Sequence, residues 1–127
     1  MEVVHGYRDL PRPLVRPAIA IGNFDGVHVG HAALIAAARA ATDGDVGVLT
    51  FEPHPAQVLA PQAAPARLTT PARKLELLAA AGVDVAIVAP FTRDLAAHTA
   101  TAFVDEILAR ALGARHVVVG EIGRAHV

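Results

Sequence analysis

The sequence predicts an α/β fold built on a doubly wound parallel β-sheet, and two features of the chain indicate it. Apolar runs of strand length, short and rich in Val and Ile, alternate along the chain with segments of helical periodicity. Residues typical of helix ends separate the two kinds of segment. This repeated order implies right-handed crossovers, which give a Rossmann-like sheet with helices on its faces.

The elements follow from these runs in order. Strands are expected at about 18–24, 46–51, 83–91 and 116–120, and helices at about 31–41, 71–81 and 100–112. Thr70 followed by Pro71 is a typical N-cap with proline in the first turn, and Gly82 follows the end of that helix. Thr99 and Gly113 bound the last helix in the same way.

The segment between the first strand and the first helix carries the clearest functional signal. It reads Ile-Gly-Asn-Phe-Asp-Gly-Val-His-Val-Gly-His over residues 21–31. Its glycines let the backbone approach a phosphate closely, and the helix that follows favours an anion at its N-terminus. His28 and His31 add side chains that can carry or donate a proton near neutral pH. The segment therefore predicts chemistry on a phosphate as well as binding.

A second polar loop follows the next expected strand. His54 lies between Pro53 and Pro55, which restrict the backbone on both sides. Parallel strands end at one edge of a sheet, so we expect this loop and the glycine-rich loop to meet there. Pro53, His54 and Pro55 are thus predicted to line a ligand site, with a purely structural turn as the alternative.

Five blocks of sequence resemble one known family. The glycine-rich segment resembles the His-x-Gly-His motif of nucleotidyltransferases, and its longer form is similar to the prokaryotic bifunctional riboflavin kinase/FMN adenylyltransferase (FAD synthetase) family. Further blocks follow in the family's order: Leu49–Pro55, Leu68–Thr70 with Lys74–Leu78, Pro90–Arg93 and His116–Gly120. The resemblance covers about Val3 to Gly120 and implies an incomplete sheet of the nucleotidyltransferase type.

The resemblance also implies an activity. AMP would pass from ATP to FMN, giving FAD and pyrophosphate, with Mg²⁺ bound to the phosphates of ATP. His28 and His31 would be the catalytic residues, although a helix cap or a surface pair is the alternative for them. The ATP-binding residues would be Gly22, Asn23, Phe24, Asp25 and Gly30. Asp25 fits an Asx turn equally well, and Pro53, His54 and Pro55 would line FMN or ATP.

Other readings of the residues stay open. A different His-x-Gly-His transferase, acting on nicotinamide mononucleotide or pantetheine phosphate, is disfavoured by Asp25-Gly26 and by the Pro-His-Pro block. A non-catalytic nucleotide-binding module is a further alternative, and it is disfavoured because binding alone does not require His28 and His31. A protein-bound metal is not expected, because zinc needs a third ligand and the chain has no cysteine.

After Gly120 the sequence departs from the family pattern. Residues 1–120 are expected to form part of an adenylyltransferase domain, and residues 121–127 to be a non-native tail. The riboflavin kinase domain of the family is expected to be absent, and the chain to be inactive alone.

Composition excludes several other classes of protein. The formal net charge is −1 and the basic residues are scattered, so no nucleic-acid partner is expected. No apolar run approaches the roughly 18 residues of a membrane-spanning helix. The absence of cysteine favours a cytoplasmic location. The oligomeric state is not indicated.

Overall fold

The structure is a computed structural model that describes the chain except residues 9, 25–28, 53–58, 60–61, 63–69 and 120–127. Its strands are β1 (Glu2–His5), β2 (Ala18–Ile21), β3 (Val46–Glu52), β4 (Val85–Pro90) and β5 (His116–Val119). They form one sheet of order β1-β4-β3-β2-β5, in which every pair is parallel. The predicted parallel α/β fold is confirmed.

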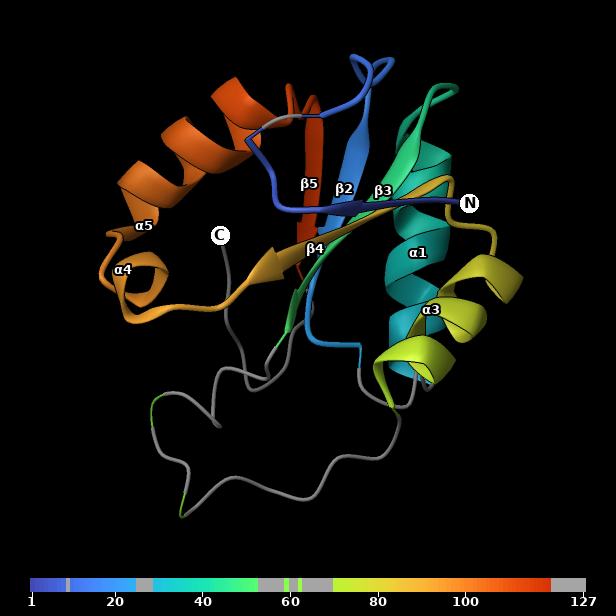
Figure 1. Ribbon diagram of the computed structural model, residues 1–127. Coiled ribbons are helices and arrows are strands. Elements are labelled where there is room, and N and C mark those ends of the chain that lie inside the picture. Colours follow the sequence, from blue (N-terminus) through green and yellow to red (C-terminus); the bar gives the residue numbers. More distant parts are fainter. Residues whose placement is uncertain (9, 25–28, 53–58, 60–61, 63–69, 120–127) are drawn as a thin grey trace.

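Helices cover both faces of this sheet (Figure 1). One side carries α1 (Val29–Ala41) and α3 (Pro71–Ala80); the other carries α4 (Arg93–Ala96), α5 (Ala100–Ala102) and the π-helix η2 (Phe103–Ala111). Each face has its own core. Ile35, Ala38 and Leu78 pack on the first, and Leu95, Ile107, Leu108 and Leu112 pack on the second.

The predicted helix ends are confirmed. Thr70 Oγ1 accepts a hydrogen bond from the Arg73 N–H at 3.1 Å, with Pro71 in the first turn of α3. Gly82 follows α3 with a φ of +93°, a left-handed conformation that glycine adopts without strain. Thr99 Oγ1 accepts from the Ala102 N–H at 3.1 Å.

Three elements differ from the sequence prediction, and one of them is the short helix α4, which was not expected. Strand β1 was not expected, because only Val4 of its four residues is buried and no apolar run marks it; it is held by pairing with β4. The last helix is a π-helix over most of its length, and the Leu112 N–H donates to Ile107 O, five residues earlier, at 3.0 Å. In this geometry Ile107 and Leu112 both reach the core.

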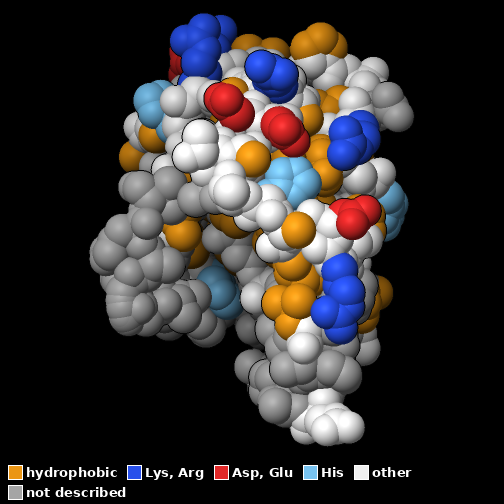
Figure 2. Space-filling view, turned by 90° about the vertical axis from the view of Figure 1, so that its left-hand side faces the viewer, with side chains coloured by type: hydrophobic (Ala, Val, Ile, Leu, Met, Phe, Trp, Pro, Cys, Tyr) orange, Lys and Arg blue, Asp and Glu red, His pale blue; other side chains and the backbone are white. Residues whose placement is uncertain are grey.

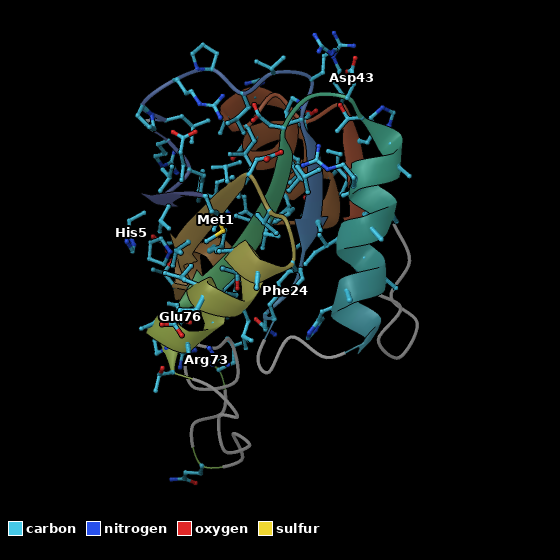
Figure 3. All side chains as sticks on the ribbon, turned by 90° about the vertical axis from the view of Figure 1, so that its right-hand side faces the viewer. Met1, His5, Phe24, Asp43, Arg73 and Glu76 are labelled. Carbon is cyan, nitrogen blue, oxygen red and sulfur yellow. The ribbon has the colours of Figure 1, made fainter. Side chains whose placement is uncertain are left out.

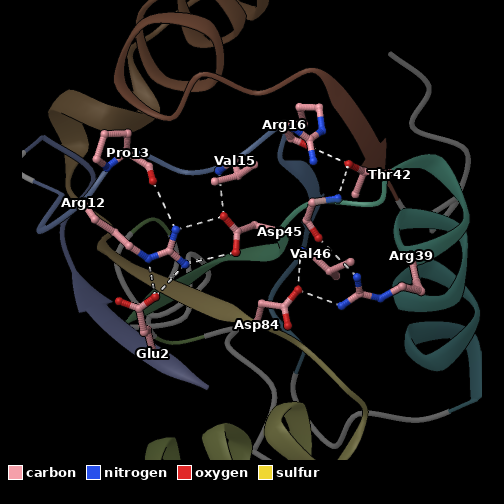
Figure 4. A network of polar contacts seen from close by, with 11 residues as sticks. Glu2, Arg12, Pro13, Val15, Arg16, Arg39, Thr42, Asp45, Val46 and Asp84 are labelled. Atoms are coloured by element: carbon pink, nitrogen blue, oxygen red, sulfur yellow. Dashed lines mark hydrogen bonds and ion pairs between the residues drawn. The ribbon is translucent and has the colours of Figure 1, made fainter.

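A polar network holds the amino ends of β3 and β4 (Figure 4). Arg12 donates to both carboxylate oxygens of Asp45 at 3.0 Å, and the Val15 N–H donates to the same carboxylate at 2.7 Å. Asp84 accepts from Arg39 at 2.7 Å and from the Val46 N–H at 2.8 Å. The hydrogen bonds from Arg12 lower the pKa of Asp45. This network lies at the end of the sheet opposite to the glycine-rich loop.

The face covered by α4, α5 and η2 carries acidic and basic side chains interspersed with apolar ones (Figure 2). Within the described part of the chain, no helix is long and apolar enough to cross a membrane. The expectation of no nucleic-acid partner stays a prediction.

Candidate active site at the carboxyl edge of the sheet

The glycine-rich loop leaves the sheet where the strand order reverses. Strand β2 lies between β3 and β5, and Ile21 at its end is level with Leu49 of β3 and Val119 of β5. The Gly22 N–H donates to Leu49 O at 3.1 Å, which extends the pairing by one residue. The chain runs from β2 to β3 and β4 on one side, whereas β5 lies on the other. Such a switch point is where open α/β sheets bind ligands.

Phe24 is the buried aromatic residue of the glycine-rich loop. It is fully buried, between α1 and α3 (Figure 3), and its φ is +54°. A bulky residue in this left-handed region is strained, and such strain persists only where the surroundings enforce it. A Cβ on Gly22 would lie 3.1 Å from the Phe24 ring. Gly22 therefore leaves the space that the ring needs.

His31 lies in the first turn of α1 and contacts Phe24. The two ring centroids are 4.9 Å apart at an interplanar angle of 44°, and His31 is only 7% exposed. Its imidazole therefore lies at a helix N-terminus, the end of a helix that favours anions. Phe24 thus restricts the orientation of a predicted catalytic histidine.

Lys74 brings a buried positive charge to the same edge. The residue is 2% exposed, and its Nζ lies near oxygens of the glycine-rich loop and of the end of β3. These are Asn23 O at 3.0 Å, Thr50 Oγ1 at 2.9 Å, Phe51 O at 3.4 Å and Glu52 Oε2 at 2.7 Å. Thr50 Oγ1 in turn donates to Asn23 O at 3.0 Å.

The sequence analysis assigned no role to Lys74, Thr50 or Glu52. A lysine on an amphipathic helix is usually solvated, so the burial of Lys74 was not expected from the sequence. One signal was present: Lys74 is four residues before the buried Leu78, so both lie on the same face of α3.

Asn23 has a buried side-chain oxygen, Oδ1, without a hydrogen-bond partner in the part of the chain that the structure describes. A buried polar atom of this kind calls for an explanation. A ligand that donates a hydrogen bond to Asn23 Oδ1 would provide this explanation.

Several predicted site residues lie outside the described part of the chain. They are Asp25, His28, Pro53, His54 and Pro55. Gly30 is in the first turn of α1. Gly22, Asn23, Phe24 and His31 are described and lie together at the carboxyl edge.

A pocket of about 370 Å³ opens beside the Lys74–Glu52 ion pair. It is lined by His5, Gly6, Glu52, Pro71, Lys74, Leu75, Val88 and Pro90. Its walls therefore come from the carboxyl ends of β1, β3 and β4 and from the start of α3. Within the described residues, no group of three or more His, Asp or Glu side chains could hold a metal ion.

This fold and site define a class: an α/β domain of nucleotidyltransferase-like, Rossmann type, with a glycine-rich loop and a histidine at its switch point. The family model described as FAD synthetase matches residues 12–123. The chain belongs to the FAD synthetase family, as the resemblance predicted.

Curated relatives agree with this family. The chain is 38% identical over 127 residues to the bifunctional riboflavin kinase/FMN adenylyltransferase of Escherichia coli K12, covering 95% of this chain and 40% of that protein. It is 40% identical over 126 residues to the protein of the same name from Pseudomonas fluorescens, with the same coverage. The chain thus spans about 40% of the length of these relatives.

A solved structure supports the fold. The structure titled as a macrolide-efflux protein from Streptococcus pneumoniae matches with a TM-score of 0.76 and 23% identity, covering 94% of this chain and 41% of that one. At this level of identity the likeness concerns the fold alone.

Proposed function

We propose that the protein containing this chain is an FMN adenylyltransferase, which transfers AMP from ATP to FMN and gives FAD and pyrophosphate. The observation that carries the proposal is the turn Gly22–Phe24 at the switch point, whose strained Phe24 packs on His31 at the start of α1. Membership of the FAD synthetase family selects FMN as the acceptor over other phosphate-bearing acceptors. The curated relatives carry this activity in their names.

The reaction asks for positioning and charge stabilisation. A phosphate oxygen of FMN bonds to the α-phosphorus of ATP, and the bond from that phosphorus to pyrophosphate breaks. Mg²⁺ bound to ATP would supply positive charge that offsets the charge of the phosphates. His28 and His31 stabilise the charge that develops in the transition state.

Binding of the two substrates is divided between the two loops. Gly22, Asn23, Phe24, Asp25 and Gly30 hold ATP, and the unpartnered Asn23 Oδ1 supports this because ATP offers hydroxyl and amino donors. Pro53, His54 and Pro55 line FMN or ATP. Residues 1–120 are part of the adenylyltransferase domain, whereas riboflavin phosphorylation belongs to a part of the relatives that this chain does not match. A cytoplasmic location fits both substrates.

The acceptor can be tested directly. Purified full-length protein is incubated with Mg²⁺ and ATP and with FMN, nicotinamide mononucleotide or phosphopantetheine, and products are separated by liquid chromatography. We expect adenylylation of FMN alone. Product with another acceptor would assign a different transferase, and ATP binding without any product would indicate a non-catalytic module.

The histidines can be tested in the same assay. His28→Ala and His31→Ala should each lower the rate of FAD formation by roughly 10²- to 10⁴-fold, the range for lost acid–base or charge stabilisation. ATP affinity should fall much less, because these groups act chiefly in the transition state. Normal turnover in both variants would remove the catalytic assignment. Riboflavin phosphorylation should persist because it belongs to another part of the protein, and retained ATP affinity with an unchanged thermal unfolding curve is the control for folding of the altered domain.

A further inference from the structure

Lys74 is the only lysine in the sequence, and every other basic side chain is an arginine or a histidine. It is also buried, at 2% exposure, at the carboxyl edge of the sheet beside the end of β3. Burying an ammonium costs more than burying an apolar side chain of the same length, unless its donors are satisfied. A methionine or leucine at position 74 would cover the sheet without that cost. The position of the charge therefore needs a reason beyond packing.

The partners of the ammonium come from separate parts of the chain. Its Nζ lies within 3.0 Å of Asn23 O, Thr50 Oγ1 and Glu52 Oε2, and 3.4 Å from Phe51 O. Asn23 belongs to the glycine-rich loop, whereas Thr50 and Glu52 belong to the end of β3. A compact ammonium on α3 thus joins three segments, and the planar fork of arginine does not reproduce this geometry.

The Asn23 carbonyl is the contact that links this network to the site. It accepts from Lys74 Nζ and from Thr50 Oγ1, each at 3.0 Å. This carbonyl shares a peptide plane with the N–H of Phe24, and two hydrogen bonds hold that plane in place. They thereby stabilise the strained φ of +54° at Phe24. The Phe24 ring, in turn, packs on His31.

We propose that Lys74 is a positioning residue for adenylyl transfer: with Thr50 it fixes the Asn23 carbonyl, and through Phe24 it sets the orientation of His31. The proposal rests on the proposed function. Lys74 acts through other residues and is not assigned a contact with ATP or FMN. Glu52 balances its charge.

The test uses the full-length protein and steady-state FAD formation. Lys74→Met keeps the length of the side chain and removes the ammonium. We expect kcat to fall by roughly 10- to 100-fold, the scale for a misplacement of about 1 Å at a reacting group. The KM for ATP should change by less than about threefold, because the loop backbone still binds phosphate.

Arg73→Met is the matched control. Arg73 precedes Lys74 on α3 and is exposed, and its guanidinium pairs with Glu76 across the helix surface at 2.9 Å (Figure 3). This variant also removes one cation from α3, so kcat should be unchanged. An equal loss of kcat in Arg73→Met would assign the effect to helix charge and overturn the proposal.

Three further variants separate positioning from folding. Lys74→Met removes the ammonium that balances the charge of Glu52, so the double variant with Glu52→Gln removes both charges and should recover thermal stability but not kcat. Recovery of kcat together with stability would show a purely structural role. Thr50→Val removes the second donor to Asn23 O and should also lower kcat, whereas Thr50→Ser keeps the hydroxyl and should restore it.

The outcomes distinguish the two proposals. No FAD from the unaltered protein rejects the proposed function. FAD formation by the unaltered protein together with normal kcat in Lys74→Met and Thr50→Val rejects the role of Lys74 alone.

Discussion

Replacing Gly22 with alanine would place a methyl group against the ring of Phe24. The added Cβ would lie 3.1, 3.4 and 3.5 Å from three atoms of that ring. The closest of these contacts is a few tenths of an ångström too short, so the ring has to move. Phe24 is fully buried and packs on His31, which leaves it little room to do so.

The size of the effect follows from this geometry. Overpacking of a well-filled core typically lowers the free energy of unfolding by about 1–3 kcal/mol. A single close contact such as this one should lie in the lower part of that range, at about 1–2 kcal/mol. The ring can relieve the contact only by shifting against His31. We therefore expect Gly22→Ala to lower kcat for FAD formation by about tenfold or more, in line with the sensitivity of reacting groups to small displacements.

The assay compares two variants of similar stability. Ile87→Val removes one methyl group from the core on the other face of the sheet and should cost about 0.5–1.5 kcal/mol. Free energies of unfolding are measured by denaturant titration, and kcat is measured well below the melting temperature. Gly22→Ala should lose both stability and kcat, and Ile87→Val stability alone. Unchanged kcat in Gly22→Ala would refute the coupling between Gly22, Phe24 and His31.

Two further predictions concern the scaffold. Thr70→Ala removes the acceptor for the Arg73 N–H and should lower the free energy of unfolding by about 1 kcal/mol, as measured by denaturant titration; no change would show that the cap is replaced by solvent. The pKa of Asp45 is lowered by the hydrogen bonds from Arg12, so the folded state gains stability from this carboxylate above its unfolded pKa near 3.9 and loses it as the pH falls through the lower folded value. Asp45→Asn should therefore be less stable at pH 7 and should show a shallower loss of stability below about pH 5; parallel pH profiles would contradict this assignment.

Local sequence patterns predicted most of the fold. The apolar strands, the N-cap at Thr70 and the helix end at Gly82 could be predicted from the sequence, because each depends on a few neighbouring residues. Strand β1 could not be predicted, since its four residues are mostly exposed and its pairing with β4 spans some eighty positions of sequence. The π-helix η2 was also missed, because a pattern of apolar residues three to five apart fits α- and π-turns alike.

The candidate site was predicted in outline only. The resemblance implied that Gly22, Asn23, Phe24 and His31 lie at the ATP site; the structure brings these residues together, and their roles stay a prediction. The left-handed backbone of Phe24 could not be anticipated, because it depends on contacts with distant residues.

One face of helix α3 carries both a core residue and the lysine that contacts the glycine-rich loop. Leu78 fills the core beside Phe24, and one turn earlier Lys74 reaches the Asn23 carbonyl from the same side of the helix. Any change that slides α3 along the sheet therefore moves the ammonium relative to the glycine-rich loop. The N-cap at Thr70 fixes where α3 begins, four residues before Lys74. The helix that covers the sheet is in this way part of the frame that holds the glycine-rich loop, on which the proposed adenylyl transfer depends.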